Sequence, residues 1–483
     1  MRELRLKRIP NKAPSTLGKL SEIKSLQTSG PYPALWCDRP PEAAYTVPIT
    51  LLHPVFNLFL EDCEGEPSEE DHAFAYDLSQ AMSGFFDDEK ERRTKFSEVC
   101  ATHGMVFVAA KIDGTEYITD GDMRCGYCIY CIVEEKVELG ATGTEPIFQA
   151  AFYYTSNMRQ RADLRKIHCT FPCLGVYLAG PMLGFMGFVY TDITQMQMLG
   201  PALRLDYHQT DLKLRRMTAQ YLRAFKQTTI RLRKFYETEF PELKSSINQS
   251  KLNPQFPCYS RYAPLPLVNS GLHEGIGSPA KDVPSSEEDS SSAAKDHEIV
   301  YTAHPFLKSL VFFGMVNDDA VCVKFATSYS KMAHLTCAAL GFAPQLLGFE
   351  ELPGGWYMLV MDRIDNEYIP MDETYEAGVS LYDGLQDLIS EALSGLHQAG
   401  YVHGDLRPAN VMVRRDGKEG LKFIDFDWSG VEGKVCYPMN VNRRDLWRPK
   451  GVVDEAPILT THDIAMVKHM FEGKQRIHGV GRM

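Results

Sequence analysis

The sequence has few features of a secreted or membrane-spanning protein. Its 12 cysteines are scattered over 483 residues and form no dense, regular framework, which favours a reduced intracellular setting. The first 24 residues carry positive charge but no apolar stretch of signal-peptide length. The most apolar run, Cys173–Tyr190, is broken by glycines into two pieces of strand length. We therefore expect neither a transmembrane segment nor a membrane partner.

Positive charge is also in deficit. The chain has 51 Lys and Arg against 63 Asp and Glu, a formal net charge of -12. This balance argues against a general nucleic-acid or membrane coat, but it leaves room for a local basic face. No internal repeat with a period of about 20 to 50 residues is evident, so a solenoid is not expected.

The length and a compositional boundary predict two domains. A chain of 483 residues exceeds the size at which one hydrophobic core keeps growing. Residues 264–295 are rich in Ser, Pro, Gly and acid, which is typical of a flexible linker, either an inert spacer or a phosphorylatable tether. The predicted parts are a tail over residues 1–35, an α/β domain over 36–262, the linker over 263–297 and a second domain over 298–483.

Two motifs in the second domain carry the residue types that phosphoryl transfer requires. This reaction needs a cation for the phosphates, ligands for Mg²⁺ and a carboxylate near the acceptor hydroxyl. The segment YVHGDLRPANVMV has the H-x-D-x-x-x-x-N spacing of a kinase catalytic loop, with Asp405 as the expected base and Asn410 as a metal ligand. Downstream, an apolar strand ends at Asp425, where the metal-binding Asp of a D-F-G element belongs, although Asp427 replaces the glycine.

An upstream strand supplies the cation. Residues 320–325 are apolar except for Lys324, which resembles the V-A-I-K lysine that contacts the phosphates of ATP. An ordinary lysine with its head group in water is the alternative. A Gly-Gly turn and a strand over residues 354–361 then lead into a hinge expected at residues 362–365.

These segments, with AHLTCAALGFAPQLLGFEELPGGWYMLVM, KFIDFDWSG and THDIAM, resemble the fungal-type protein kinases, a divergent kinase-like family. The resemblance covers about residues 304–470. It implies a bilobal α+β protein-kinase-like fold, ATP and Mg²⁺ as cofactors and a protein substrate. It also implies that Asp463 braces the catalytic loop, and Arg407 joins Asp405 and Lys324 in the expected catalytic set.

Some departures from the kinase pattern bear on activity. No acidic residue occurs from Phe325 to Phe349, so the helix of this region lacks the glutamate that usually pairs with the lysine. The hairpin over residues 307–323 holds only Gly314, although a phosphate-covering loop normally needs several glycines. Asp425 is followed by residues 426–483, a stretch that is short for the helices of a kinase C-terminal lobe, so we expect this lobe to be shortened. We expect an ATP- and Mg²⁺-dependent kinase acting on Ser/Thr hydroxyls; a pseudokinase or binding module is the alternative.

The first domain reads as an α/β domain with a mixed sheet, because helix-like and strand-like segments alternate. The predicted helices cover residues 71–100, 149–160 and 210–237, and the predicted strands cover residues 105–111, 127–139, 170–178 and 182–191.

A candidate nuclease site lies in the first domain. Asp120 or Asp122, followed by Glu134 and Lys136, has the form D…E-x-K, and strand alternation places the last two on one face. Gln149 opens a Q-x-x-x-Y pattern on the next helix. This order resembles the restriction-endonuclease-like superfamily and implies Mg²⁺-dependent cleavage of nucleic acid. A solvent-facing strand without catalytic function is the alternative.

A nuclease-like region ahead of a kinase-like domain also resembles fungal Crinkler-type effectors, which implies a location in the cytoplasm or nucleus. The helix expected over residues 211–234 is rich in Lys and Arg. Its cations, among them Lys213, Arg216 and Arg223, would suit a nucleic-acid partner. The alternative is the solvated face of an amphipathic helix.

Overall fold

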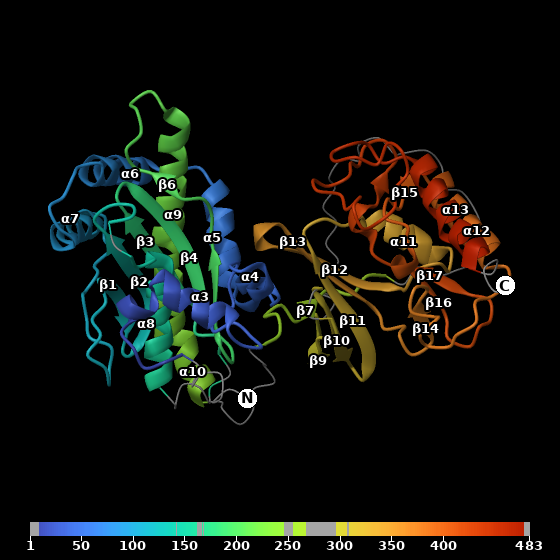
Figure 1. Cartoon of the computed structure of the whole chain (residues 1–483), viewed down its shortest axis with the longest axis horizontal. Helices are drawn as coiled ribbons and strands as arrows, with labels where there is room; N and C mark the ends of the chain where they lie inside the picture. The colour runs from blue at the N-terminus through green and yellow to red at the C-terminus, as the bar shows by residue number, and fades with distance from the viewer. Residues whose placement is uncertain are drawn as a thin grey trace, which may run out of the picture. The chain divides into compact units, whose positions relative to one another are not determined.

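The computed structural model describes residues 9–141, 143–161, 167, 169–245, 255–266, 296–306 and 309–477. Contacts along the chain divide it into two compact units, Met1–Tyr259 and Ser260–Met483, called here the first and second units (Figure 1). Most of the predicted linker, residues 267–295, lies outside the described residues.

The first unit is built on a six-stranded sheet, in the order β1-β2-β3-β4-β5 with β6 beside β4. Strands β2 and β3 are parallel and the other pairs are antiparallel, so the sheet is mixed, as predicted. The strands are β1 (Gly121–Cys125), β2 (Cys128–Lys136), β3 (Cys173–Ala179), β4 (Met182–Tyr190), β5 (Thr194–Met198) and β6 (Leu203–Arg204).

Helices surround this sheet, and one of them makes the crossover between the parallel strands. Helix α8 joins β2 to β3, and its residues 148–158 are all buried. The helices are α2 (Pro14–Leu17), α3 (Leu20–Thr28), α4 (Ile49–Leu52), α5 (Pro54–Glu64), α6 (Glu69–Met82), α7 (Glu89–Thr102), α8 (Pro146–Gln160), α9 (Leu212–Lys234) and α10 (Phe240–Ser245). A 3-10 turn, Pro41–Ala44, precedes α4, and a π-helical turn, Phe235–Glu239, follows α9.

Several predicted elements of the first unit were wrong. The residues assigned to a tail form α2 and α3, which bury Leu17 and Ile23. The helix predicted over residues 71–100 is two helices, because Asp88 caps the start of α7 by accepting a hydrogen bond from the Glu91 amide. Residues 105–111 form only isolated bridges, at Val108 and Lys111, and no strand.

The second unit begins with an antiparallel sheet of five strands in the order β12-β13-β11-β10-β9, accompanied by α11. A short pair, β7 (Arg261–Tyr262) and β8 (His297–Glu298), precedes it. The elements are β9 (Val300–Ala303), β10 (Val311–Val316), β11 (Asp319–Ala326), α11 (Lys331–Ala339), β12 (Leu346–Leu352), the 3-10 turn Pro353–Gly355 and β13 (Trp356–Asp362).

A second lobe follows β13 and contains helices α12 and α13, which lie side by side, together with small sheets (Figure 1). Helix α12 buries Leu385, Ile389 and Leu396 at helical spacing against the core of this lobe. The second unit thus combines a sheet lobe and a helical lobe, as the sequence predicted. The elements are β14 (Tyr368–Pro370), α12 (Leu385–Gln398), β15 (Tyr401–Val402), β16 (Val411–Arg414), β17 (Leu421–Phe423), β18 (Gly430–Val431) and α13 (Thr460–Ile477), with 3-10 turns at Pro408–Asn410 and Phe426–Trp428.

One bent pair of helical segments, Pro41–Leu52 and Pro54–Glu64, meets the length and composition of a membrane span. No single helix within the described residues does so.

Candidate functional site

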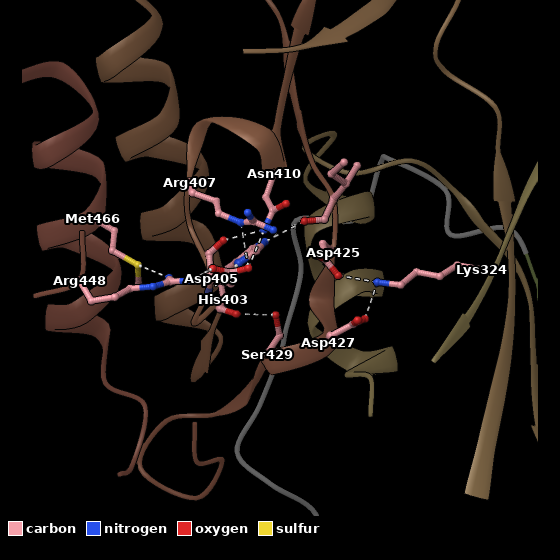
Figure 2. Close-up of polar contacts among 11 residues, drawn as sticks. Lys324, His403, Asp405, Arg407, Asn410, Asp425, Asp427, Ser429, Arg448 and Met466 are labelled. Carbon is pink, nitrogen blue, oxygen red and sulfur yellow. Dashed lines mark hydrogen bonds and ion pairs between the residues drawn. The ribbon is translucent and has the colours of Figure 1, made fainter. Parts of the chain in front are cut away.

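The loop between β15 and β16 holds Asp405 in a network of hydrogen bonds. The side-chain amide of Asn410 donates to the backbone carbonyl oxygen of Asp405 at 2.8 Å and to the Asp405 carboxylate at 2.9 Å. The Arg407 guanidinium lies 3.2 Å from the same carboxylate oxygen. The spacing of Asp405 and Asn410 in the sequence therefore closes the loop on itself and leaves the Asp405 carboxylate oriented (Figure 2).

Asp463, in the first turn of α13, is hydrogen-bonded to the backbone of this loop. Its carboxylate is buried and accepts hydrogen bonds from the backbone amides of His403 and Gly404, each at 2.8 Å. Gly404 has φ +82°, and a Cβ atom there would lie 3.0 Å from the Trp428 carbonyl oxygen. Only glycine suits this position without strain, because the left-handed region costs other residues conformational energy. The geometry matches the bracing function that the family resemblance implied for Asp463.

The strand β17 delivers Asp425 to the same region. Asp425 has φ +70°, a left-handed conformation that turns the chain sharply. The next side chain, Phe426, is fully buried; its ring stacks on His334 of α11 with the centroids 4.8 Å apart and lies tilted against His403 with the centroids 5.2 Å apart. The buried ring therefore fixes the position from which the Asp425 carboxylate projects.

Lys324 reaches the carboxylates of Asp425 and Asp427 (Figure 2). Its amine forms an ion pair with Asp425 and lies 2.5 Å from Asp427. Burial lowers the pKa of Lys324, but the two carboxylates outweigh this effect and raise it, so the amine stays protonated. Helix α11 contains no acidic residue, as expected, and Glu350 accepts a hydrogen bond from the Ala263 amide. Asp427, which the sequence analysis considered only as a lost glycine, is the additional partner of Lys324.

Lys324, Asn410, Asp425 and Asp427 line one cavity of about 920 Å³ within the second unit, whereas Asp405 is not among its lining residues. Strand alternation in β11 directs Cys322 and Lys324 to the cavity and the neighbouring Val321 and Val323 to the core. The remaining walls include the apolar side chains of Met361, Met412 and Ile424. A pocket of this size with an apolar floor and a few convergent polar groups is typical of a site for a small ligand.

The loop over the cavity was wrongly located from the sequence. Gly314 lies inside strand β10, and the turn between β10 and β11 is at Asn317 and Asp318. The cavity is bordered instead by described residues from the segment between β9 and β10, whose sequence over residues 304–310 (HPFLKSL) contains no glycine. Pro305, Phe306 and Ser309 of this segment line the cavity.

Arg448 is a site residue that the sequence analysis missed. Its guanidinium lies 2.6 Å from the Asp405 carboxylate, and its side chain is only 4% exposed. It also lies over the Trp428 ring, 5.0 Å from the centroid, and donates to the sulfur of Met466 (Figure 2). Arg448 is 43 residues from Asp405 and belongs to no spaced motif, so no signal in the sequence pointed to it.

The oxygen donors at the cavity fit Mg²⁺. Carboxylate and amide oxygens are the ligands that this hard cation prefers, and Asn410, Asp425 and Asp427 supply them on the cavity wall. The side chains of Asp425 and Asp427 are 29% and 34% exposed. Among the residues that the structure describes, no group of three or more His, Cys, Asp or Glu side chains is arranged around one point for a metal. In this structure Lys324 forms ion pairs with both Asp425 and Asp427.

In the first unit, the predicted D…E-x-K residues come together only in part. Lys136 lies 2.7 Å from Glu134 and 3.7 Å from Glu89 of α7. Glu134 is fully buried, and burial followed by the charge of Asp120 raises its pKa. Its second carboxylate oxygen has no hydrogen-bond partner among the described residues. We call Glu89, Asp120, Glu134 and Lys136 the Lys136 cluster.

The structure distinguishes the two aspartates that the sequence left open. Asp122 pairs with Arg124 and accepts a hydrogen bond from Thr119, away from Lys136, so its assignment to the site is wrong. Asp120 pairs with Arg93 at 2.9 Å and accepts a hydrogen bond from the Glu135 amide at 3.0 Å. Asp120 lies just before β1, which begins at Gly121, so the alternation that would place residues two apart on one face does not apply to it.

The neighbouring helix adds Gln149 and Tyr153 to this region. Burial, followed by the charges of Glu134 and Asp120, raises the pKa of Tyr153, which lies beside Gln149. All residues of β2 are buried, so the alternative of a solvent-facing strand is also wrong. Glu89 was missed because its helix precedes the motif and shows no spacing relation to it.

Several cations of the basic helix α9 are paired with acidic side chains, whereas Lys213 is exposed and forms no ion pair among the described residues. Arg223 and Arg231 pair with Asp62, Arg216 pairs with Glu66, and Lys226 lies 3.7 Å from Glu70. These acidic partners belong to α5 and α6 or to the turn between them. Pairing reduces the positive potential that a phosphate backbone would meet, so nucleic-acid binding here stays a prediction.

Comparisons with known proteins give no family assignment. No family model matches the chain. Citron Rho-interacting kinase of Mus musculus is 33% identical over 108 residues, which is 22% of this chain and 4% of that protein, and the Rattus norvegicus protein gives the same figures. The chain thus spans a small fraction of these curated relatives. The kinase PK-1 of Cydia pomonella granulovirus matches with a TM-score of 0.25 and 17% identity, over 34% of this chain and 62% of that chain.

A TM-score of 0.25 is too low to support an argument about the fold. The kinase-like description therefore rests on the two lobes of the second unit and on the convergence of Lys324, Asp405, Asn410 and Asp425. The resemblances to fungal-type kinases and to Crinkler-type effectors stay predictions.

Proposed function

We propose that the second unit is an ATP- and Mg²⁺-dependent phosphotransferase of the protein-kinase class. The observation that carries this proposal is the convergence of Lys324 from β11, Asn410 from the catalytic loop and Asp425 from the end of β17 on one cavity. These side chains are a cation and oxygen donors of the kinds that phosphoryl transfer uses, arranged by the expected elements.

In the proposed reaction, Lys324 binds the phosphates of ATP, and Asn410 and Asp425 hold Mg²⁺. Bound Mg²⁺ would neutralise charge on the phosphate oxygens. Asp405 accepts the proton of a Ser/Thr hydroxyl while the hydroxyl oxygen bonds to the γ-phosphorus of ATP. The bond between the γ-phosphorus and the β,γ-bridging oxygen breaks, which releases ADP. Arg407 contacts the Asp405 carboxylate and would orient it during the transfer.

The proposal is tested by transfer of label from γ-labelled ATP to protein substrates by the purified full chain. We expect Asp405→Ala to lower the initial rate by about 100-fold or more, because general bases contribute about 10²–10⁴. The exposed Asp383→Ala is the matched control and should retain the rate. Equal labelling by wild type and Asp405→Ala would contradict the assignment. Nucleotide binding without transfer would favour the pseudokinase alternative.

A second candidate function, Mg²⁺-dependent cleavage of nucleic acid, is favoured by the Lys136 cluster. Glu134 is fully buried with one carboxylate oxygen unpartnered among the described residues, beside Lys136 and near Glu89 and Asp120. Carboxylate oxygens are the ligands that Mg²⁺ prefers, and a lysine would steady charge on a scissile phosphate. We expect Lys136→Ala to abolish DNA cleavage and the exposed control Lys90→Ala to retain it. Cleavage by Lys136→Ala at the wild-type rate would eliminate this candidate.

The finer assignments belong to the same proposal. They are membership of the fungal-type kinases, a Ser/Thr acceptor on a protein, and a location in the cytoplasm or nucleus. Labelled products digested and separated as phosphoserine, phosphothreonine and phosphotyrosine would identify the acceptor. Label on phosphotyrosine alone would contradict it.

A further inference from the structure

The second unit lacks the usual partner of its phosphate-binding lysine. In protein kinases, an ion pair between the strand lysine and a helix glutamate must be in place for activity. Helix α11 (Lys331–Ala339) contains no acid, and its residue near the lysine is His334. The His334 ring is buried, hydrogen-bonded to the Pro344 carbonyl oxygen and to the Tyr329 hydroxyl, and stacked on Phe426. The helix therefore offers Lys324 no carboxylate.

Two carboxylates meet Lys324 instead, and both come from one turn. Asp425 and Asp427 flank the buried Phe426, and each contacts the lysine amine. Asp425 follows the strand that delivers a metal ligand in this fold, so its oxygens are needed for Mg²⁺ in the proposed function. Asp427 is left as the carboxylate that holds the lysine while Asp425 binds the metal.

The backbone around Asp427 is tied to the lysine strand and to the start of α11. The Ser328 hydroxyl donates to the Asp427 carbonyl oxygen at 2.9 Å. The Ser330 amide donates to the Phe426 carbonyl oxygen at 3.1 Å. Ser328 follows β11 and Ser330 caps α11, so these bonds hold the turn at a set distance from Lys324.

We propose that Asp427 is the positioning residue for Lys324, replacing the absent helix glutamate, and that Asp425 remains free to bind Mg²⁺. The inference rests on the proposed function of the second unit. It places the anchor of the lysine and the metal ligand on one turn, which is itself hydrogen-bonded to the start of α11 through Ser330.

The test is the affinity of the full chain for a fluorescent ATP analogue, measured with and without Mg²⁺. We expect Asp427→Asn to weaken binding about 10-fold under both conditions, because a lysine without its charged partner is poorly positioned. Asp427→Glu keeps a carboxylate and should stay within about 3-fold of wild type. Asp425→Asn should instead lose the gain in affinity that Mg²⁺ provides. The exposed Asp319→Asn is the matched control and should bind like wild type.

The variant Asp427→Gly separates this inference from a simpler explanation. It restores the D-F-G sequence, so it should improve binding if the missing glycine were the defect of this site. We expect it to weaken binding as Asp427→Asn does. Adding His334→Glu to Asp427→Gly should recover at least half of the lost binding free energy. If the double variant does not fold, the two single variants still test the inference. Asp427→Asn should keep the gain in affinity from Mg²⁺, and Asp425→Asn should lose it.

The outcomes are distinguishable from failure of the proposed function. Wild type that binds no ATP analogue would overturn both the function and the Asp427 inference. Wild type that binds, with Asp427→Asn binding equally or more tightly, would overturn the inference alone, since Asp427 would then be only a competitor for the lysine. Thermal unfolding of each variant shows whether a change in affinity reflects loss of folded protein.

Discussion

Each unit of the chain holds a lysine among carboxylates, but the two clusters differ in their access to solvent. The partner of Lys136, Glu134, has no exposed side chain surface. The partners of Lys324, Asp425 and Asp427, are 29% and 34% exposed and line a cavity. We call Lys324, Asp425 and Asp427 the Lys324 cluster.

This difference has an electrostatic consequence. Burial raises the pKa of Glu134, so the Lys136 cluster favours a protonated acid unless a cation compensates the charge. In the Lys324 cluster, the charge of Lys324 outweighs burial and lowers the pKa of Asp425, so this carboxylate stays ionised, whereas burial raises the pKa of Asp427 to about 7. An open, charged cluster is suited to exchange a lysine contact for a nucleotide. A closed cluster needs a metal before its acids are all charged.

The largest expected effect comes from exchanging the lysines for methionine. Lys324→Met should lower phosphate transfer by about 100-fold or more, since a charge aimed at the transferred group is worth about 10²–10³ in rate. It should leave any DNA cleavage unchanged, and Lys136→Met should do the reverse. Both activities are measured on each purified variant. A variant that loses both would show that the two clusters do not act separately.

The next effect is on stability and concerns the buried pair beside the Lys324 cluster. Arg448→Met should destabilise the protein by about 3 kcal/mol, because it leaves the Asp405 carboxylate buried without this partner. Arg407→Met is the matched control, since the Arg407 side chain is 38% exposed. It should cost about 1 kcal/mol or less. Urea unfolding followed by fluorescence measures both, and equal costs would contradict the buried pairing.

A pH effect is expected at His334. Burial lowers the pKa of His334 to about 4, whereas an unfolded histidine titrates near about 6.5. The unfolded state therefore binds the proton first, and stability falls as pH drops below about 6.5 towards about 4. At pH 5 the loss relative to pH 8 is about 2 kcal/mol.

Urea unfolding over this pH range should show a smaller loss for His334→Gln than for wild type. His208→Gln, at an exposed position of the first unit, should keep the wild-type pH profile. An unchanged profile for His334→Gln would show that this ring is not responsible for the acid sensitivity.

The smallest effect tests how Glu89 is positioned in the Lys136 cluster. The Asp88 side chain accepts a hydrogen bond from the Glu91 amide at 2.8 Å and so caps α7 at the residue before Glu89. Asp88→Ala should cost about 1 kcal/mol of stability, measured by thermal unfolding. Ser83→Ala, at an exposed position in the segment before α7, is the control and should be neutral. Equal unfolding temperatures for both variants would argue against the cap.

Much of the second unit was predictable because its motifs are local. Asp405 and Asn410 lie within one loop, and the hydrogen bond between them follows from their spacing. The apolar strand before Asp425 and the single lysine of β11 were visible for the same reason. The lack of an acid on α11 was also evident, but its consequence was not, because Asp427 appeared only as a missing glycine.

The first unit was less predictable because its site depends on which way buried side chains point. The sequence pattern gave no reason to prefer Asp120 or Asp122. Only their partners in the folded chain, Arg93 for Asp120 and Arg124 for Asp122, distinguish them. Glu89 arrives from a helix far upstream. Helices α2 and α3 lie in the predicted tail. Short helices show only a weak hydrophobic periodicity in the sequence, because tertiary packing provides most of their stability.

By itself, the sequence determined the residue types and spacings that close a loop or alternate along a strand, because these depend on neighbours in the chain. This is why Asp405, Asn410, Asp425 and Lys324 were identified before their positions were known. Only the tertiary structure decided that Asp427 and not a helix residue meets Lys324, and that Arg448 covers Asp405. Such contacts join residues about 40 to 100 positions apart, and they depend on packing that no local pattern records.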